Sequence, residues 1–111
     1  MTGTVGTAKV YENERMVIWE FVLEPGERAA CHTHQLDYVF YALEGSRLEV
    51  FDANDGFLFA FDSNQGDAFA FRCDGGELIS TDGRGLRAPA TQSARNAGAG
   101  RYREMLVETK Q

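Results

Sequence analysis

Turn signals recur along this chain at intervals of about ten residues, a spacing typical of short antiparallel strands. The signals are Pro25-Gly26, Gly45, Asp55-Gly56, Gln65-Gly66, Gly75-Gly76, Asp82-Gly83 and Gly98. Between them the side chains alternate, as in residues 68–71, where every second residue is Phe. No window has the three- and four-residue apolar spacing of an amphipathic helix. The pattern predicts an antiparallel all-β domain, either a jelly roll or a small barrel.

The chain has 111 residues, which is enough for one domain with one hydrophobic core. We expect residues 1–15 to form an N-terminal arm or an edge strand, and residues 16–111 to form the domain itself. The segment 16–23 is apolar on both faces of an extended strand, since Val17 and Phe21 alternate with Ile18 and Val22. This favours a strand covered on both sides, and we expect a second copy of the chain to form a homodimer there.

The net charge of −6 and the absence of a Lys/Arg stripe argue against nucleic acid as a partner. The sequence has no apolar run of membrane-spanning length, and its first fifteen residues lack the apolar region of a signal peptide. Cys31 and Cys73 are too few for a disulfide framework and too far apart for a CxxC motif. We therefore expect a cytoplasmic protein that binds neither nucleic acid nor membrane.

The two histidines of the chain, His32 and His34, are separated by a single residue. On a strand, residues at this spacing point to the same face of the sheet. Two imidazole nitrogens on one side of a sheet form half of a metal site. The alternative is a pair of surface histidines at the mouth of a loop, and the flanking sequence favours the metal site.

Residues 26–45 read GERAACHTHQLDYVFYALEG and resemble the first cupin motif, in which a glycine, an HxH pair, an acid and a second glycine stand at fixed spacings. Gly66 resembles the start of the second cupin motif. Residues 89–98 resemble its close, where a histidine precedes an asparagine by four residues. The resemblance covers about residues 17–109 and is greatest to small single-domain cupins of the HxHxxDY type.

The resemblance implies a cupin-type jelly-roll β-barrel, or double-stranded β-helix, with a divalent metal ion (iron, nickel, zinc or manganese) in its mouth. His32 and His34 match the first two metal ligands, and Gln92 stands where the third histidine is expected. Its amide oxygen is a weaker ligand than an imidazole.

Tyr38 stands at the position of the acid, and a tyrosine ligates well only as phenolate, although its ordinary pKa is about 10. Asp37 is adjacent to it but points to the other face of a regular strand. A bulge would bring Asp37 in, so the identity of the fourth ligand stays open between Tyr38 and Asp37.

The leading hypothesis is a metal-dependent enzyme that acts on a small polar or carboxylated metabolite in the barrel mouth, with Tyr38 as the proton-transfer group if it is not a ligand. Iron would suit a dioxygenase, and nickel or zinc an isomerase or lyase. The alternative is a non-catalytic cupin module with a degenerate metal site, which binds a small ligand or only dimerises.

Overall fold

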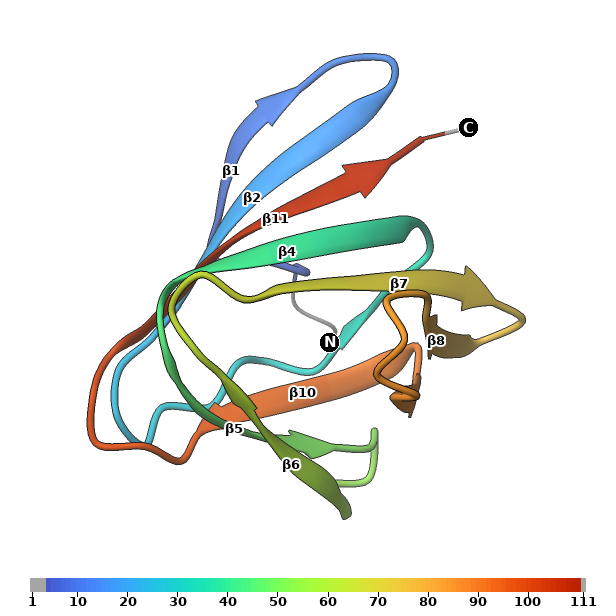
Figure 1. Ribbon diagram of the computed structural model, residues 1–111. Helices are drawn as coiled ribbons and strands as arrows, with labels where there is room; N and C mark the ends of the chain where they lie inside the picture. The colour runs from blue at the N-terminus through green and yellow to red at the C-terminus, as the bar shows by residue number, and fades with distance from the viewer. Residues whose placement is uncertain (1–3, 111) are drawn as a thin grey trace.

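The computed structural model describes residues 4–110, and the regular structure in that range consists of eleven strands in two antiparallel sheets that face each other (Figure 1). The larger sheet has, in spatial order, β1 (Ala8–Glu12), β2 (Met16–Leu23), β11 (Tyr102–Thr109), β4 (Asp37–Glu44), β7 (Ala68–Asp74), β8 (Glu77–Ser80) and β9 (Arg87–Pro89). The smaller sheet has β3 (His32–Thr33), β10 (Thr91–Asn96), β5 (Ser46–Phe51) and β6 (Phe57–Ser63). The antiparallel all-β prediction is confirmed.

The expected turns fall between the strands, and the hairpin that joins β7 to β8 explains why glycine occurs there. Its two connecting residues, Gly75 and Gly76, have φ angles of 60° and 86°. Two-residue hairpin loops favour positive φ at both positions, a conformation that glycine adopts at little cost.

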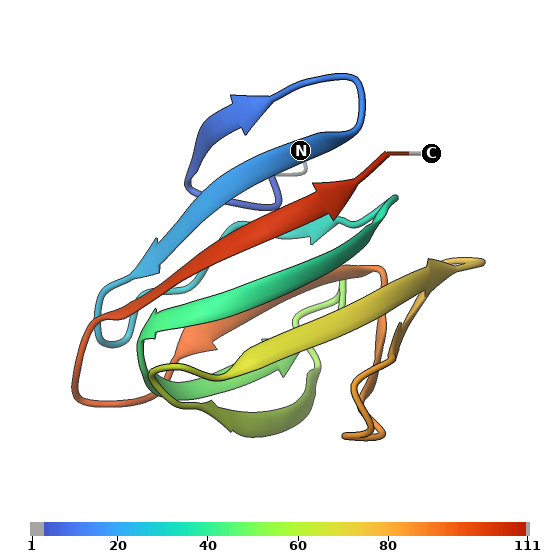
Figure 2. The same cartoon turned by 45° about the horizontal axis from the view of Figure 1, so that its top comes forward.

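The chain passes between the two sheets at one end of the sandwich, which we call the closed end. There β4 leads into β5, β6 into β7 and β10 into β11 (Figures 1 and 2). Asn96 lies at this end and is fully buried. Its amide nitrogen donates to the carbonyl oxygens of Leu23 (2.9 Å) and Gly100 (2.8 Å), and its amide oxygen accepts from the Ser46 hydroxyl (2.6 Å) and the Gly98 amide (3.0 Å). One side chain therefore joins strands of both sheets.

The hydrophobic core lies between the sheets and is rich in phenylalanine. Phe40 and Phe69 stack with their ring centroids 4.8 Å apart, and Phe71 and Leu106 are buried beside them. Burying a side chain of this size contributes about 1.5–3 kcal/mol to stability. The alternate apolar residues of β4 and β7 therefore face the interior, as the alternation in the sequence predicts.

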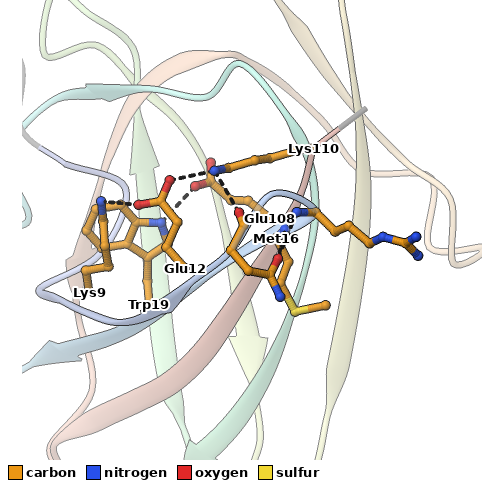
Figure 3. A network of polar contacts seen from close by, with 8 residues as sticks. Lys9, Glu12, Met16, Trp19, Glu108 and Lys110 are labelled. Carbon is orange, nitrogen blue, oxygen red and sulfur yellow. Dashed lines mark hydrogen bonds and ion pairs between the residues drawn. The ribbon is translucent and has the colours of Figure 1, made fainter.

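β1 is an edge strand with exposed side chains, and polar contacts connect it to the end of the chain (Figure 3). Glu12 accepts from Lys110 at 2.6 Å and from Lys9 at 2.7 Å, and these hydrogen bonds lower its pKa to about 2. Beside them, the Trp19 indole of β2 donates to Glu108 of β11 at 2.7 Å. Strand pairing therefore holds the edge strand to β2, and the ion pair of Glu12 with Lys110 holds it to the segment after β11.

The outer face of the larger sheet carries an apolar stripe. In the strand register, Ile18 of β2 lies opposite Val107 of β11, which lies opposite Val39 of β4. Val39 and Tyr41 are 38% and 49% exposed. The apolar second face of β2 thus lies within a larger uncovered apolar surface.

Among residues 4–110 there is no helix long and apolar enough to cross a membrane.

Candidate functional site

A cavity lies between the two sheets, and most of the side chains that line it are apolar. A water molecule's centre can occupy about 70 Å³ of this cavity. On this measure one water needs about 10–15 Å³, so the cavity has room for roughly five to seven waters, or for a ligand with a similar number of non-hydrogen atoms. Five polar side chains line it, from both sheets: His32, His34, Tyr38, Gln92 and Glu104.

The histidine pair enters the cavity as the spacing predicted. His32 lies in β3 and His34 one residue beyond the strand, where its backbone amide donates to the Ala90 carbonyl at 2.9 Å. Both rings are buried, at 3% and 4% exposure, with centroids 4.9 Å apart. His34 also stacks on Tyr38 at 4.3 Å. The two histidines are therefore interior groups, and the alternative of a surface pair is wrong.

The hydrogen bonds of the two rings differ. His32 Nδ1 lies 3.0 Å from the Ala30 carbonyl oxygen, which can only accept, so Nδ1 carries the proton and Nε2 keeps its lone pair. His34 Nδ1 is fully enclosed and lacks a partner among the described residues. Neither Nε2 atom has a hydrogen bond within the described chain, and neither is fully enclosed. Both nitrogens are therefore unpaired within the described residues, on two side chains that line the cavity.

Burial lowers the pKa of both histidines, because desolvation penalises the charged ring. The pKa of His34 falls to about 3, with a second contribution from His32. Both imidazoles are thus neutral at pH 7, the protonation state that a metal ligand needs.

Gln92 lies on the same side of its sheet as His32, because the two residues are direct partners in the antiparallel pairing of β10 with β3. It lines the cavity, as does Ala94, while Arg95 between Ala94 and Asn96 turns outward and pairs with Glu49 at 2.9 Å. The structure therefore brings Gln92 and the histidine pair to one cavity.

Tyr38 and Asp37 separate as strand alternation requires. Asp37 lies outside the cavity lining and accepts a hydrogen bond from the Cys73 backbone amide at 2.9 Å. Tyr38 is buried in the cavity wall, and burial, followed by the nearby Glu104, raises its pKa well above the ordinary value. In this environment Tyr38 is a neutral phenol, which can donate a hydrogen bond and is disfavoured as a phenolate ligand.

Glu104 is a cavity residue that sequence reasoning missed. In residues 102–108, Met105 and Val107 alternate with Glu104 and Glu108, and the glutamates rather than the apolar residues face the interior. Burial raises the pKa of Glu104 to about 8, although a hydrogen bond from Tyr102 opposes this. The signal for it was present, because Tyr102 and Leu106 share the alternation phase of the two glutamates.

The donor atoms of the cavity residues decide whether a metal ion could bind there. Among residues 4–110, no group of three or more His, Cys, Asp or Glu side chains could hold a metal. His32 meets the usual pattern, in which one ring nitrogen donates to a carbonyl and the other is free to ligate. With His34 and Gln92 the set comprises two imidazoles and one amide oxygen. This fits an ion that keeps open positions for water or a ligand.

Known structures share this fold at low sequence identity. A cupin domain from Bordetella pertussis Tohama I matches with a TM-score of 0.65 over 98% of this chain and 100% of its own, at 16% identity. A conserved Klebsiella pneumoniae protein with a double-stranded β-helix domain matches with a TM-score of 0.56 over 97% of this chain and 82% of its own, at 14% identity. The polyketide cyclase RemF from Streptomyces resistomycificus matches with a TM-score of 0.52 over 87% of this chain and 56% of its own, at 17% identity.

No protein-family model and no curated protein matches the sequence. At these identities, structural likeness establishes the fold and leaves the activity open. The chain therefore has the double-stranded β-helix fold of cupin domains, and the fold class expected from its turn spacing and its HxH segment is confirmed.

Proposed function

We propose that this chain binds a divalent metal ion through His32, His34 and Gln92 and presents it to a small molecule in the cavity. One observation carries the proposal: two buried, neutral imidazoles have their Nε2 atoms free beside an amide that lies opposite one of them. Iron, nickel, zinc and manganese all accept this donor set.

When bound, the metal would supply a Lewis acid that polarises a carbonyl or hydroxyl oxygen of the ligand. The residues of the chain supply the rest of the chemistry. Phe40, Phe71 and Leu106 exclude water from the ligand, and Tyr38 holds a proton that it can donate at its phenol oxygen. We infer an enzyme of the dioxygenase, isomerase or lyase type, with Tyr38 as proton donor.

The cavity lining favours an uncharged ligand over a carboxylated one. Lys and Arg are absent from the described residues that line the cavity. A ligand carboxylate would therefore lack a cationic side chain and would depend on the metal for its counter-charge. We infer a ligand of about six non-hydrogen atoms, mainly apolar, with one polar group.

Metal analysis tests the proposal. Protein purified without a metal-affinity tag should contain close to one equivalent of metal, and His32→Ala should lose most of it, because one imidazole and an amide form a poor site. Thr33→Ala is the matched control. Thr33 is the next residue of β3, lies outside the cavity lining and bonds Thr91 at 3.0 Å, so this variant should keep its metal. Equal metal content in all three proteins would contradict the proposal.

The second candidate is a non-catalytic module that binds a small ligand without metal. It is favoured by the absence of a third His, Cys, Asp or Glu ligand among residues 4–110, where Gln92 occupies the remaining position. Wild-type protein that contains no metal after purification, and takes up none on dialysis against zinc or iron(II), would favour this candidate.

A further inference from the structure

A series of three hydrogen-bonded side chains leads from the smaller sheet to the cavity. Ser63, at the end of β6, has its hydroxyl 3.0 Å from the Tyr102 hydroxyl, which donates to Glu104 Oε1 at 2.6 Å. All three residues are buried, and Glu104 is 3% exposed. The last of the three side chains, Glu104, has a carboxyl group that lines the cavity.

The Tyr102 hydroxyl donates its single proton to Glu104 Oε1. With that proton engaged, the Ser63 hydroxyl is the donor to the Tyr102 oxygen. Glu104 Oε1 therefore acts as an acceptor. In a neutral carboxyl group the proton then resides on Oε2.

Glu104 Oε2 has no hydrogen-bond partner among the described residues, and it is not sealed from the cavity space. Its surroundings keep the carboxyl neutral. In the strand register it lies between Phe21 of β2 and Ala42 of β4, and no cationic side chain of the described chain lines the cavity. A buried donor without a partner is costly unless a ligand or water meets it.

Glu104 lies nearer than Tyr38 to the closed end of the sandwich, where β4 leads into β5. Tyr38 and Ala42, the register partner of Glu104, are four residues apart on β4, or roughly 13 Å along the strand. The histidines and Tyr38 contact one another, whereas Glu104 is supported by the separate chain through Tyr102 and Ser63. The cavity thus has two polar ends joined by apolar walls.

We propose that Glu104 anchors a ligand toward the closed end of the sandwich by donating a hydrogen bond from Oε2 to a carbonyl or ether oxygen of a small, mainly apolar molecule. The inference rests on the proposed ligand cavity and is independent of the metal. It assigns the ligand an oxygen acceptor at the end that lies toward the closed end of the sandwich.

The test compares cyclopentanone, which has six non-hydrogen atoms and one acceptor, with cyclopentane, which has none. Dissociation constants for both are measured by ligand-observed NMR on the protein as purified. The wild type should prefer the ketone. Glu104→Leu should reduce this preference by about threefold to tenfold, the value of one hydrogen bond. Glu108→Gln is the matched control, because Glu108 is a buried acid of the same strand that binds Trp19 and lies outside the cavity lining.

A second measurement uses a variant that keeps the partner of Tyr102. Glu104→Gln retains an acceptor for the Tyr102 hydroxyl and offers an amide N–H in place of the carboxylic O–H. The infrared carbonyl stretch of bound cyclopentanone should lie at lower frequency in the wild type than in this variant, because the carboxylic acid is the stronger donor. Glu108→Gln should leave the frequency at the wild-type value.

The inference is overturned if the wild type shows no preference for the ketone, if neither probe binds, or if the preference and the carbonyl frequency survive both changes at Glu104. Metal content, measured on the same samples, separates the two proposals. A metal-loaded wild type with no ketone preference would overturn the role of Glu104 and leave the metal site standing. A ketone preference in protein that contains no metal and takes up none on dialysis would support the role of Glu104 and contradict the metal site.

Discussion

Gln92 lies directly opposite His32 across the antiparallel pair of β10 and β3, and both side chains line the same cavity. The amide therefore occupies a place from which an imidazole would reach the same space. This relationship makes residue 92 the position at which the proposed metal site can be tested by substitution.

Gln92→His should tighten the binding of zinc or nickel by about tenfold or more, because an imidazole replaces a weak neutral oxygen donor. Competition with a chromogenic chelator measures the change. Arg95→His adds a histidine to the same strand on its outer face and should leave the affinity unchanged. Equal affinities in all three proteins would mean that residue 92 does not ligate.

Glu104 should make the metal-free protein less stable as the pH rises from 7 to 8. Its pKa is about 8 in the folded state against 4.5 as a free side chain, so the folded state keeps a proton that the unfolded chain has lost. The resulting stabilisation is complete below pH 4.5 and is lost as the pH approaches 8. The expected slope is at most about 1.4 kcal/mol per pH unit.

The groups near Glu104 contribute less in this pH range. His32 and His34 have lowered pKa values, so they stabilise the folded state as the unfolded chain loses its protons around pH 6.5, and this opposing effect fades above pH 7. The pKa of Tyr38 and that of Tyr102 are raised above the range. Urea denaturation across the range should show the decline in wild type and its loss in Glu104→Gln. Glu12→Gln, which changes a surface carboxyl, should keep the decline. An unchanged slope in Glu104→Gln would assign it to another group.

We propose that a second copy of the chain covers the apolar stripe of Ile18, Val107 and Val39. Light scattering coupled to size exclusion should give about twice the chain mass of 12.3 kDa. Val39→Lys should shift the protein toward monomer, because it introduces a charge into the stripe. Leu58→Lys, at a comparably exposed apolar residue of the smaller sheet, should not. A wild-type mass of one chain at micromolar concentration would refute the dimer.

Asn96→Ala should lower the free energy of unfolding by about 3 kcal/mol or more, since the change removes all four hydrogen bonds of a fully buried side chain. Asn64→Ala, at an exposed turn position, should change it by no more than about 0.5 kcal/mol. Thermal or urea unfolding measures both. A small effect at Asn96 would mean that water replaces the lost amide.

The features that could be predicted from the sequence are those set by local geometry. Turn glycines and alternation determine the strands, and the two-residue period places His32 and His34 on one face and Asp37 away from Tyr38. The position of Gln92 is inferred from its spacing to Asn96, and in the strand register Gln92 lies opposite His32.

What could not be predicted depends on which face of a strand is covered. In residues 102–108 the pattern allows either the glutamates or Met105 and Val107 to face inward, and only the opposing sheet decides between them. Glu104 is tolerated inside because Tyr102 meets one of its oxygens. The missing partner of His34 Nδ1 also depends on packing from distant strands and leaves no trace in the local sequence.

The side chains that end at Glu104 have a mechanical consequence. Ser63 belongs to the smaller sheet and Tyr102 to the larger, so the hydrogen bond between them spans the gap between the layers. A ligand bound to Glu104 would polarise and strengthen the hydrogen bond between Ser63 and Tyr102, and would thereby resist separation of the two sheets at the closed end. By reciprocity, any force that separates the sheets would weaken ligand binding. The distance between the sheets and the affinity for the ligand are then coupled.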